Sequence, residues 1–242
     1  MIDIHSHILP GIDDGAKDLK DTEELLKQME NQGVTTAVAT PHFYPGSAVF
    51  DDFLESRAAA MSKVCDLCGG AKKIKILPGA EVLYFSGIGN SEDICKLTLA
   101  GSNYLLLELM GLKAIDYRVI NDIYNLKANF GIITIIAHIE RYYKYKGYKE
   151  LLTLVQSGDA VSQINASHIF SSREKRAVKK LIKSGMAHFV ASDCHNPVNR
   201  PVELDHAYNE IKTLSNEQYL KIVNDNESME RELLAAYEKQ NG

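Results

Sequence analysis

Imidazole and carboxylate side chains recur in short motifs spread along the whole chain. The motifs are His5-Ser6-His7, Asp13-Asp14-Gly15, Thr40-Pro41-His42, Gly79-Ala80-Glu81, Leu107-Glu108, Ala137-His138 and Ser192-Asp193-Cys194-His195. A mixture of imidazole and carboxylate ligands suits zinc, manganese or iron rather than calcium or a thiolate cluster. Any one of these residues taken alone is more often a loop residue in contact with water, but their coordinated recurrence favours a shared metal site.

The elements that must position these side chains are short strands alternating with helices. Apolar runs predict strands at residues 1–5, 34–40, 74–81, 103–108, 132–138, 161–165 and 187–192. A helix is expected after Asp18, where Leu19, Leu25, Leu26 and Met29 form an apolar stripe. Regular β-α alternation implies parallel strands with right-handed crossovers, in an open doubly wound sheet or in a closed barrel. No glycine-rich phosphate loop follows the first strand, which disfavours a nucleotide-binding version.

Six of the seven predicted strands end in a histidine or an acidic residue. The carboxyl ends of parallel strands meet at one rim, where α/β proteins place their active sites. Because residues i and i+2 of a strand share a face, His5 with His7 and Asp193 with His195 can each direct two side chains into one pocket. The sequence therefore predicts a single metal-binding rim.

The composition is that of an ordinary globular protein and gives no sign of a linker. The chain has 242 residues, 45% hydrophobic and 24% charged, with a formal net charge of −5, and we expect one domain over residues 1–242. The acidic balance disfavours binding to nucleic acid. Four unevenly spaced cysteines do not form a disulfide framework, and no apolar stretch reaches the length of a membrane span. A cytoplasmic location without stable membrane insertion is expected, whereas the oligomeric state stays open.

These motifs resemble those of the PHP (polymerase and histidinol phosphatase) superfamily, whose mark is the opening H-x-H. Within it, the segments around His5-Ser6-His7, Ala39-Thr-Pro-His42, Pro78-Gly-Ala-Glu81, Ala137-His-Ile-Glu-Arg-Tyr142 and Ala191-Ser-Asp-Cys-His-Asn196 are similar to the bacterial manganese-dependent protein-tyrosine phosphatases of the CpsB/YwqE type. The resemblance implies a distorted seven-stranded (β/α)7 PHP-type barrel with its active site at the carboxyl ends of the strands.

The resemblance also implies a site with three divalent metal ions, with manganese favoured over iron or zinc. The implied ligands are His5, His7, Glu81 and Asp193 for one metal, Glu81, Glu108 and His138 for a second, and Asp14, His42 and His195 for a third. Arg141 and Arg200 fall at positions where the family binds the substrate phosphate. Asp14 is a candidate proton donor, with a metal-bound water as the alternative.

The implied activity is metal-dependent hydrolysis of phosphotyrosine in proteins. The implied substrate is the phosphorylated tail of a bacterial tyrosine kinase that controls capsular or exopolysaccharide synthesis. The leading alternative is a small-molecule phosphatase of the histidinol-phosphate type. A nuclease and a catalytically silent module that binds phosphotyrosine tails are two further hypotheses.

One rival motif points to a different chemistry. Cys194 and Arg200 form a C-x5-R sequence, which resembles the nucleophile loop of cysteine-dependent tyrosine phosphatases. That loop needs consecutive backbone N–H donors, but Pro197 lacks one and the segment has no glycine. Strand alternation also predicts that Cys194 faces away from the metals, so we expect a mechanism that does not depend on cysteine.

Two weaker patterns lie outside the metal motifs. The tyrosines Tyr142, Tyr143, Tyr145 and Tyr148 follow Arg141, where they either line the mouth of the active site or pack against neighbouring loops. Four cations, Arg173, Arg176, Lys180 and Lys183, share a helical face that either docks an acidic tail or a membrane surface or is simply solvated. His168 follows the sixth predicted strand, where it touches substrate or makes a structural hydrogen bond.

Overall fold

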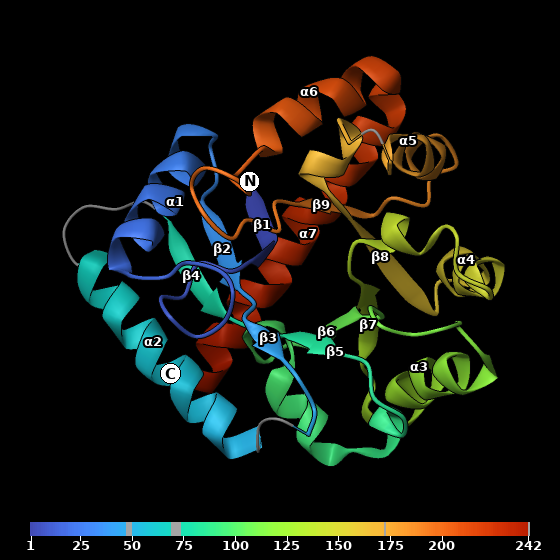
Figure 1. The fold of residues 1–242 in the computed structure, drawn as a ribbon, viewed down its shortest axis with the longest axis horizontal. Coiled ribbons are helices and arrows are strands. Elements are labelled where there is room, and N and C mark those ends of the chain that lie inside the picture. Colours follow the sequence, from blue (N-terminus) through green and yellow to red (C-terminus); the bar gives the residue numbers. More distant parts are fainter. Residues whose placement is uncertain (47–49, 69–73, 172, 242) are drawn as a thin grey trace.

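A computed structural model of the chain describes residues 1–46, 50–68, 74–171 and 173–241. Figure 1 shows strands in the centre of the molecule with helices arranged around them. Nine strands form two sheets in this part of the chain, and every strand pair is parallel. The predicted parallel α/β architecture is therefore confirmed.

The smaller sheet has three strands in the order β1-β2-β4, and the larger has six in the order β3-β5-β6-β7-β8-β9. The strands are β1 (Ile2–Ser6), β2 (Thr36–Ala39), β3 (His42–Phe43), β4 (Lys75–Pro78), β5 (Glu81–Leu83), β6 (Tyr104–Glu108), β7 (Ile133–Ile136), β8 (Ala160–Asn165) and β9 (Phe189–Ala191). Each of the seven predicted segments overlaps at least one of them.

Two chain segments cross from the smaller sheet to the larger one, a crossing that the pattern of apolar runs does not predict. β2 and β3 are separated at Thr40 and Pro41, since proline has no N–H for the sheet. β4 and β5 are separated at Gly79 and Ala80. A Cβ on Gly79 would lie 2.9 Å from side-chain atoms of Leu99 and Val38, so only glycine fits there. The prediction of one strand over 74–81 was therefore wrong, and His42 and Glu81 lie in strands of the larger sheet.

The first and last strands of the chain lie side by side. Asp193 donates its backbone N–H to the carbonyl of His5 at 2.9 Å, and His7 donates to the carbonyl of Cys194 at 2.9 Å. An isolated parallel bridge joins Ser6 to Cys194. These contacts bring the motif that opens the sequence against the motif near residue 193.

Seven α-helices and five short 3-10 helices connect the strands in the described ranges. The α-helices are α1 (Leu19–Asn31), α2 (Phe50–Cys68), α3 (Tyr117–Phe130), α4 (Tyr148–Ser157), α5 (Lys175–Lys183), α6 (Leu204–Leu214) and α7 (Asn216–Asn241), and the 3-10 helices are η1 (Ile88–Asn90), η2 (Glu92–Leu97), η3 (Leu99–Gly101), η4 (Ile139–Tyr142) and η5 (Ala166–Ile169). The Asp18 side chain accepts hydrogen bonds from the first turn of α1, as the predicted helix start requires. Within the described residues, no helix combines the length and apolar character needed to span a bilayer.

Two clusters of buried apolar side chains hold the strands in place. The larger cluster packs the helices against the outer faces of the sheets. In the smaller one, Met229 and Leu233 of α7 pack with Ile2 and Ile4 of β1 and with side chains from β2, β4, β6, β7, β9 and η3. α7 passes behind β1 and β2 in Figure 1. The packing of α7 therefore holds in place the strands that carry the polar motifs, and their carboxyl ends remain available to form a site.

Candidate metal centre

A cavity of about 380 Å³ opens where the strands end at their carboxyl termini. Its lining includes both arginines singled out by the sequence and six of the nine predicted metal ligands, which are Asp14, His42, Glu81, Glu108, His138 and Asp193. The other three, His5, His7 and His195, are buried against these residues. All eleven predicted site residues therefore meet in one place.

His5 and His7 extend from the end of β1 toward the same two carboxylates. The Nε2 atoms of the two imidazoles are 3.2 Å apart. Glu81 Oε2 lies 3.2 Å from His5 Nε2 and 3.3 Å from His7 Nε2. Asp193 Oδ1 lies 3.4 Å and 3.5 Å from the same two nitrogens. The i, i+2 spacing thus directs both side chains into one pocket, as predicted.

Glu81 is the central carboxylate of the cavity. Its Oε1 lies 2.9 Å from His138 Nε2, and its Oε2 lies 3.0 Å from His42 Nδ1. Glu108 Oε1 is 3.4 Å from His138 Nε2, so the two carboxylates flank one imidazole. Since Glu81 also contacts His5, it joins the donor groups on both sides of the cavity.

The outer part of the site combines one exposed acid with two imidazoles. Asp14 Oδ1 lies 3.4 Å from His42 Nε2 and 3.4 Å from His195 Nε2. The Asp14 side chain is 67% exposed, whereas those of His42 and His195 are 10% and 2% exposed. Asp14 is therefore the acidic residue of the set that is most open to solvent and to an incoming substrate.

Asp193 connects the imidazoles to both arginines. Its Oδ2 accepts hydrogen bonds from Arg141 at 3.0 Å, from Arg200 at 2.8 Å and from Asn165 at 2.5 Å. The backbone of Asp193 has a φ of +51°, and that of His138 has a φ of +32°. Non-glycine residues rarely adopt such conformations, which cluster at functional sites.

Burial and close charges shift the pKa values of the site in opposite directions. Burial alone would raise the pKa of Glu81, but the charge on His5 and the adjacent imidazoles of His138 and His42 hold that pKa well below its usual range. Burial also opposes ionisation of Asp193, yet the charge on His5 and a hydrogen bond from His7 keep its pKa well below the ordinary value. For His195, burial and the positive charge on His7 lower the pKa to about 3. Glu81 and Asp193 therefore stay ionised and His195 stays neutral at pH 7, which are the protonation states that metal ligands need. Against the effect of burial, hydrogen bonds to Glu108 and Glu81 raise the pKa of His138 to about 9, so this imidazole carries a proton that a bound ion would displace.

The donor set fits bound metal ions. Three groups have ligand atoms within 4.8 Å of one another: His7, Asp14, His42 and His195; His5, His7 and Glu81; and His42, Glu81 and Glu108. His42 Nδ1, Glu81 Oε2 and His195 Nε2 are buried and make no well-aligned hydrogen bond to any described residue, although His42 Nδ1 lies only 3.0 Å from Glu81 Oε2. Orphaned buried polar atoms are costly, and a coordinated ion would satisfy all three.

Several residues that hold the site in shape carry roles that the sequence did not reveal. Asp13 accepts from His7 Nδ1 at 2.7 Å and from the backbone N–H of His42 at 3.1 Å. Gln163 Oε1 lies 3.1 Å from His5 Nδ1 and accepts from the backbone N–H of His138 at 2.9 Å. Such partners fix the tautomer and orientation of a ligating imidazole. No local motif identifies them, because their partners are far away in the sequence.

The loop after β1 needs glycine at position 15. A Cβ on Gly15 would lie 2.3 Å from the carbonyl oxygen of His7 and 2.9 Å from Asp13 Oδ1. Its backbone N–H donates to Asp13 Oδ1 at 2.9 Å. This close approach folds the loop back on itself, so that Asp13 reaches His7 while Asp14 faces the cavity.

The tyrosine segment divides between two roles. Tyr142 is fully buried, and its hydroxyl lies 3.1 Å from His138 Nδ1 and accepts a hydrogen bond from the backbone N–H of Leu109 at 2.9 Å. Tyr143 is partly exposed and lies outside the metal cavity. Beyond the segment, His168 Nδ1 lies 2.5 Å from Glu140 Oε1, which matches the structural alternative for that histidine.

Cys194 faces away from the cavity, as strand alternation predicts. Its side chain is completely buried in the larger apolar cluster. Burial, together with the negative charge of Asp3, raises the pKa of the thiol far above its ordinary value. A buried, protonated thiol is inert as a nucleophile.

We therefore expect Cys194→Ser to retain most of the phosphatase activity that the family resemblance implies. The change removes a thiol that does not reach the cavity, so kcat/KM should stay within about threefold of the unchanged chain, although the buried hydroxyl should lower the free energy of unfolding by about 1–2 kcal/mol. Steady-state kinetics on an aryl phosphate and thermal melting measure both quantities. Loss of activity in a variant that is folded at the assay temperature would restore the cysteine mechanism.

Parallel strands that end in a shared cluster of imidazoles and carboxylates define the class of metal-dependent α/β hydrolases. The family model for capsular polysaccharide synthesis, CpsB/CapC, matches residues 1–230. The tyrosine-protein phosphatase CpsB of Streptococcus pneumoniae is 33% identical over 227 residues, covering 87% of this chain and 89% of the relative. The tyrosine-protein phosphatase YwqE of Bacillus subtilis is 32% identical over 211 residues, covering 83% of this chain and 79% of the relative. The chain belongs to the CpsB/CapC family.

A solved structure agrees with this assignment. It comes from work on YwqE of Bacillus subtilis and CpsB of Streptococcus pneumoniae, described there as unique metal-dependent tyrosine phosphatases. It superposes with a TM-score of 0.77 at 28% identity and covers 93% of each chain. The family resemblance stated from the sequence is confirmed.

Proposed function

We propose that this chain is a metal-dependent protein-tyrosine phosphatase. The observation that carries the proposal is the convergence of nine imidazole and carboxylate ligands with Arg141 and Arg200 around one cavity. Metal ligands paired with two guanidinium groups suit hydrolysis of a phosphate ester. The family membership and the names of the relatives support phosphotyrosine as the ester.

The proposed cofactors are three divalent ions, with manganese favoured over iron or zinc. We assign His5, His7, Glu81 and Asp193 to one ion, Glu81, Glu108 and His138 to a second, and Asp14, His42 and His195 to a third. The close groups of ligand atoms support this assignment in part, because His5, His7 and Glu81 form one group and Asp14, His42 and His195 belong to another. In the third group His42 rather than His138 joins Glu81 and Glu108, although His138 Nε2 lies 2.9 Å from Glu81 and 3.4 Å from Glu108. When bound, such ions act as Lewis acids and lower the pKa of coordinated water.

The protein's own residues bind and orient the substrate. Arg141 and Arg200 both donate to Asp193 Oδ2, and each guanidinium keeps further N–H groups for phosphoryl oxygens. Asp14, which is exposed at the mouth, is the proposed proton donor, with a metal-bound water as the alternative because a carboxylate that ligates a metal carries no proton. The tyrosine leaving group has a pKa of about 10, so its departure needs less protonation than that of an alkoxide.

One side of the metal cavity is apolar, and we assign the contact with the phenyl ring of the substrate to this side. Leu83 and Met110 line it, and Met110 is 39% exposed. The ring of Tyr44 stacks on His42 with the centroids 5.0 Å apart. These side chains favour an aryl phosphate over a strongly polar alkyl phosphate.

The proposed fold is a distorted seven-stranded barrel in a single domain over residues 1–242. In this description β2 with β3 and β4 with β5 each count as one interrupted strand, and the contacts between β1 and the segment after β9 join the ends. The proposed substrate is the phosphorylated tail of a bacterial tyrosine kinase in capsular or exopolysaccharide synthesis, which the family description supports. The free thiols of Cys95 and Cys194 support a reducing, cytoplasmic location.

Substrate preference tests the proposal against its alternatives. With the same manganese concentration in every assay, we expect hydrolysis of a phosphotyrosine peptide to exceed that of histidinol phosphate by at least about a hundredfold in kcat/KM, because a pocket contact with an aryl ring is worth several kcal/mol. Single-stranded DNA should not be cleaved.

Each alternative has its own signature in this comparison. A marked preference for histidinol phosphate would establish the small-molecule phosphatase, and cleavage of DNA would establish the nuclease. Binding of phosphotyrosine without turnover in manganese-loaded protein would establish a silent binding module.

A further inference from the structure

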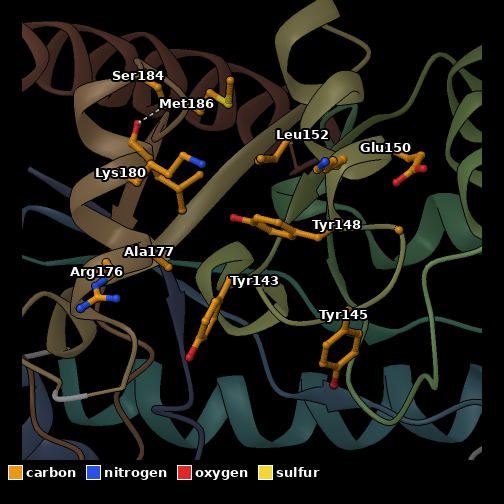
Figure 2. Close-up of a pocket in the computed structure, with 13 residues that line it drawn as sticks. Tyr143, Tyr145, Tyr148, Glu150, Leu152, Arg176, Ala177, Lys180, Ser184 and Met186 are labelled. Carbon is orange, nitrogen blue, oxygen red and sulfur yellow. Dashed lines mark hydrogen bonds between the residues drawn. The ribbon is translucent and has the colours of Figure 1, made fainter.

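A second cavity, of about 680 Å³, lies between α4, α5 and the loop that carries the tyrosines. Figure 2 shows Tyr143 and Tyr148 opposite Arg176 and Lys180, which project from α5. The apolar part of the lining includes Leu152 and Met186. Aromatic and aliphatic walls with a few charged groups at the rim are typical of a ligand-binding pocket.

The chain connects this cavity directly to the proposed active site. Arg141 lines the metal cavity, Tyr142 is buried in the core beneath it, and Tyr143 lines the second cavity. Consecutive Cα atoms are about 3.8 Å apart, so the backbones of Arg141 and Tyr143 are separated by at most about 7.6 Å. The two cavities are therefore close enough for one extended polypeptide to reach both.

The loop that forms one wall is held in a single conformation. Gly147 has a φ of +90°, and a Cβ there would lie 1.8 Å from the carbonyl oxygen of Ile115. Ile115 donates its backbone N–H to the carbonyl of Lys146 at 2.8 Å, and Tyr145 donates to that of Tyr142 at 2.8 Å. A preformed wall reduces the ordering cost of binding.

The rim of the cavity is positive although the whole chain has a net charge of −5. Arg176 and Lys180 are exposed on one face of α5, and neither forms an ion pair with any residue in the described part of the chain. Lys149 also lines the cavity, and Lys144 Nζ lies 5.1 Å from the centre of the Tyr143 ring. The only acid among the lining residues of this described cavity is Glu150. This charge pattern selects an acidic occupant.

We propose that this second cavity binds an acidic stretch of the substrate polypeptide that flanks the phosphotyrosine and carries a large apolar or aromatic side chain. The inference rests on the proposed function, and it names the part of the substrate that the metal cavity does not hold. The apolar side chain inserts between Tyr143 and Tyr148, while its acidic neighbours meet Arg176 and Lys180. Part of each weak sequence pattern thus belongs to one surface, namely Tyr143, Tyr145 and Tyr148 of the tyrosine run and Arg176 and Lys180 of the basic helix face.

A double charge reversal, Arg176→Glu with Lys180→Glu, tests whether these two cations bind the acidic residues of the substrate. The substrates are p-nitrophenyl phosphate, a twelve-residue phosphotyrosine peptide rich in Asp and Glu, and the same peptide with Asn and Gln instead. We expect KM for the acidic peptide to rise about tenfold with kcat unchanged, because two attractions between opposite charges become repulsions. Turnover of p-nitrophenyl phosphate should not change, since that substrate does not reach the second cavity.

A matched control places the same two charges elsewhere. Lys63→Glu on α2 with Arg231→Glu on α7 changes the net charge equally at exposed positions, and it should leave KM for the acidic peptide within twofold. Tyr143→Ala tests whether the cavity binds an apolar side chain of the substrate, because this change leaves the charge of the rim unaltered. It should raise KM for both peptides but not for p-nitrophenyl phosphate.

The outcomes separate this inference from the proposed function. If the unchanged chain hydrolyses none of the three substrates with manganese, the proposed function fails. If it hydrolyses them all and the charge reversal shifts KM no more than the control does, the docking site is wrong. Loss of binding to vesicles of phosphatidylserine and phosphatidylcholine, with peptide kinetics unaffected, would instead assign the surface to a membrane.

Discussion

Replacement of Asp193 by asparagine is expected to lower kcat/KM for a phosphotyrosine peptide by about a thousandfold or more, since loss of one group that aligns transition-state donors costs about 10²–10³-fold on its own. Asp193 Oδ1 lies within 3.5 Å of His5 and His7, and its Oδ2 accepts from Arg141 and Arg200. The asparagine amide has no negative charge, so the contacts with the two imidazoles and with the two arginines are both weakened. The arginines then lose the anchor that aims them at the phosphate, and one proposed metal loses a ligand.

Asparagine is chosen because it preserves shape and backbone conformation. The left-handed φ of +51° at position 193 is tolerated by asparagine better than by alanine. Circular dichroism and the melting temperature of the metal-free variant should therefore resemble those of the metal-free parent. Cys194→Ser, one residue away, is the matched control. If kcat/KM of Asp193→Asn stayed within tenfold of the parent value, Asp193 would be neither an essential metal ligand nor the anchor of the two arginines.

Chelation is expected to abolish phosphatase activity, and added manganese is expected to restore it. Four proposed carboxylate ligands, Asp14, Glu81, Glu108 and Asp193, lie around one cavity. All but Asp14 are buried, and burial of their negative charge is unfavourable without a counter-ion. A ligand that binds only the folded state at a hundred times its dissociation constant adds about 2.7 kcal/mol of stability. The melting temperature should therefore fall after EDTA treatment and recover with manganese.

If the proposal is right, the same bound ions raise the melting temperature and support turnover. Metal analysis of the purified protein measures their number, and titration of the metal-free chain with manganese should raise activity and melting temperature together. In Asp193→Asn the manganese-dependent increase in melting temperature should be smaller than in the parent. Full turnover by protein that contains no metal would contradict the proposed chemistry.

The strands and the metal-binding rim were predictable because they follow from local patterns. Short apolar runs predict β6, β7 and β8 within two residues at either end. The side chains at their carboxyl ends, such as Glu108 and His138, then follow from the geometry of parallel strands. Family resemblance added what patterning cannot give, namely the grouping of ligands and the partnership of Arg141 with Arg200.

Contacts between distant segments were not predictable. The transfer of the chain from one sheet to the other depends on packing around Gly79, where Val38 and Leu99 leave no room for a Cβ. The roles of Asp13 and Gln163 depend on imidazoles that other strands deliver. Nothing in the tyrosine run distinguishes buried Tyr142 from its exposed neighbour Tyr143, because the distinction arises from the turn of η4 after β7.

The pairing of β1 with the segment after β9 determines when the site can assemble during synthesis. Ser192 and Asp3, which are 189 residues apart, are hydrogen-bonded at 3.0 Å beneath the cavity. At about 5–20 residues per second, a ribosome needs roughly 10–40 s to extend the chain that far. His5 and His7 leave the ribosome first and have no contacts with Asp193, His195 and Arg200 until those residues have been synthesised. The complete metal site is therefore a late product of folding, and a chain released before β9 would carry an acidic, unfinished cluster.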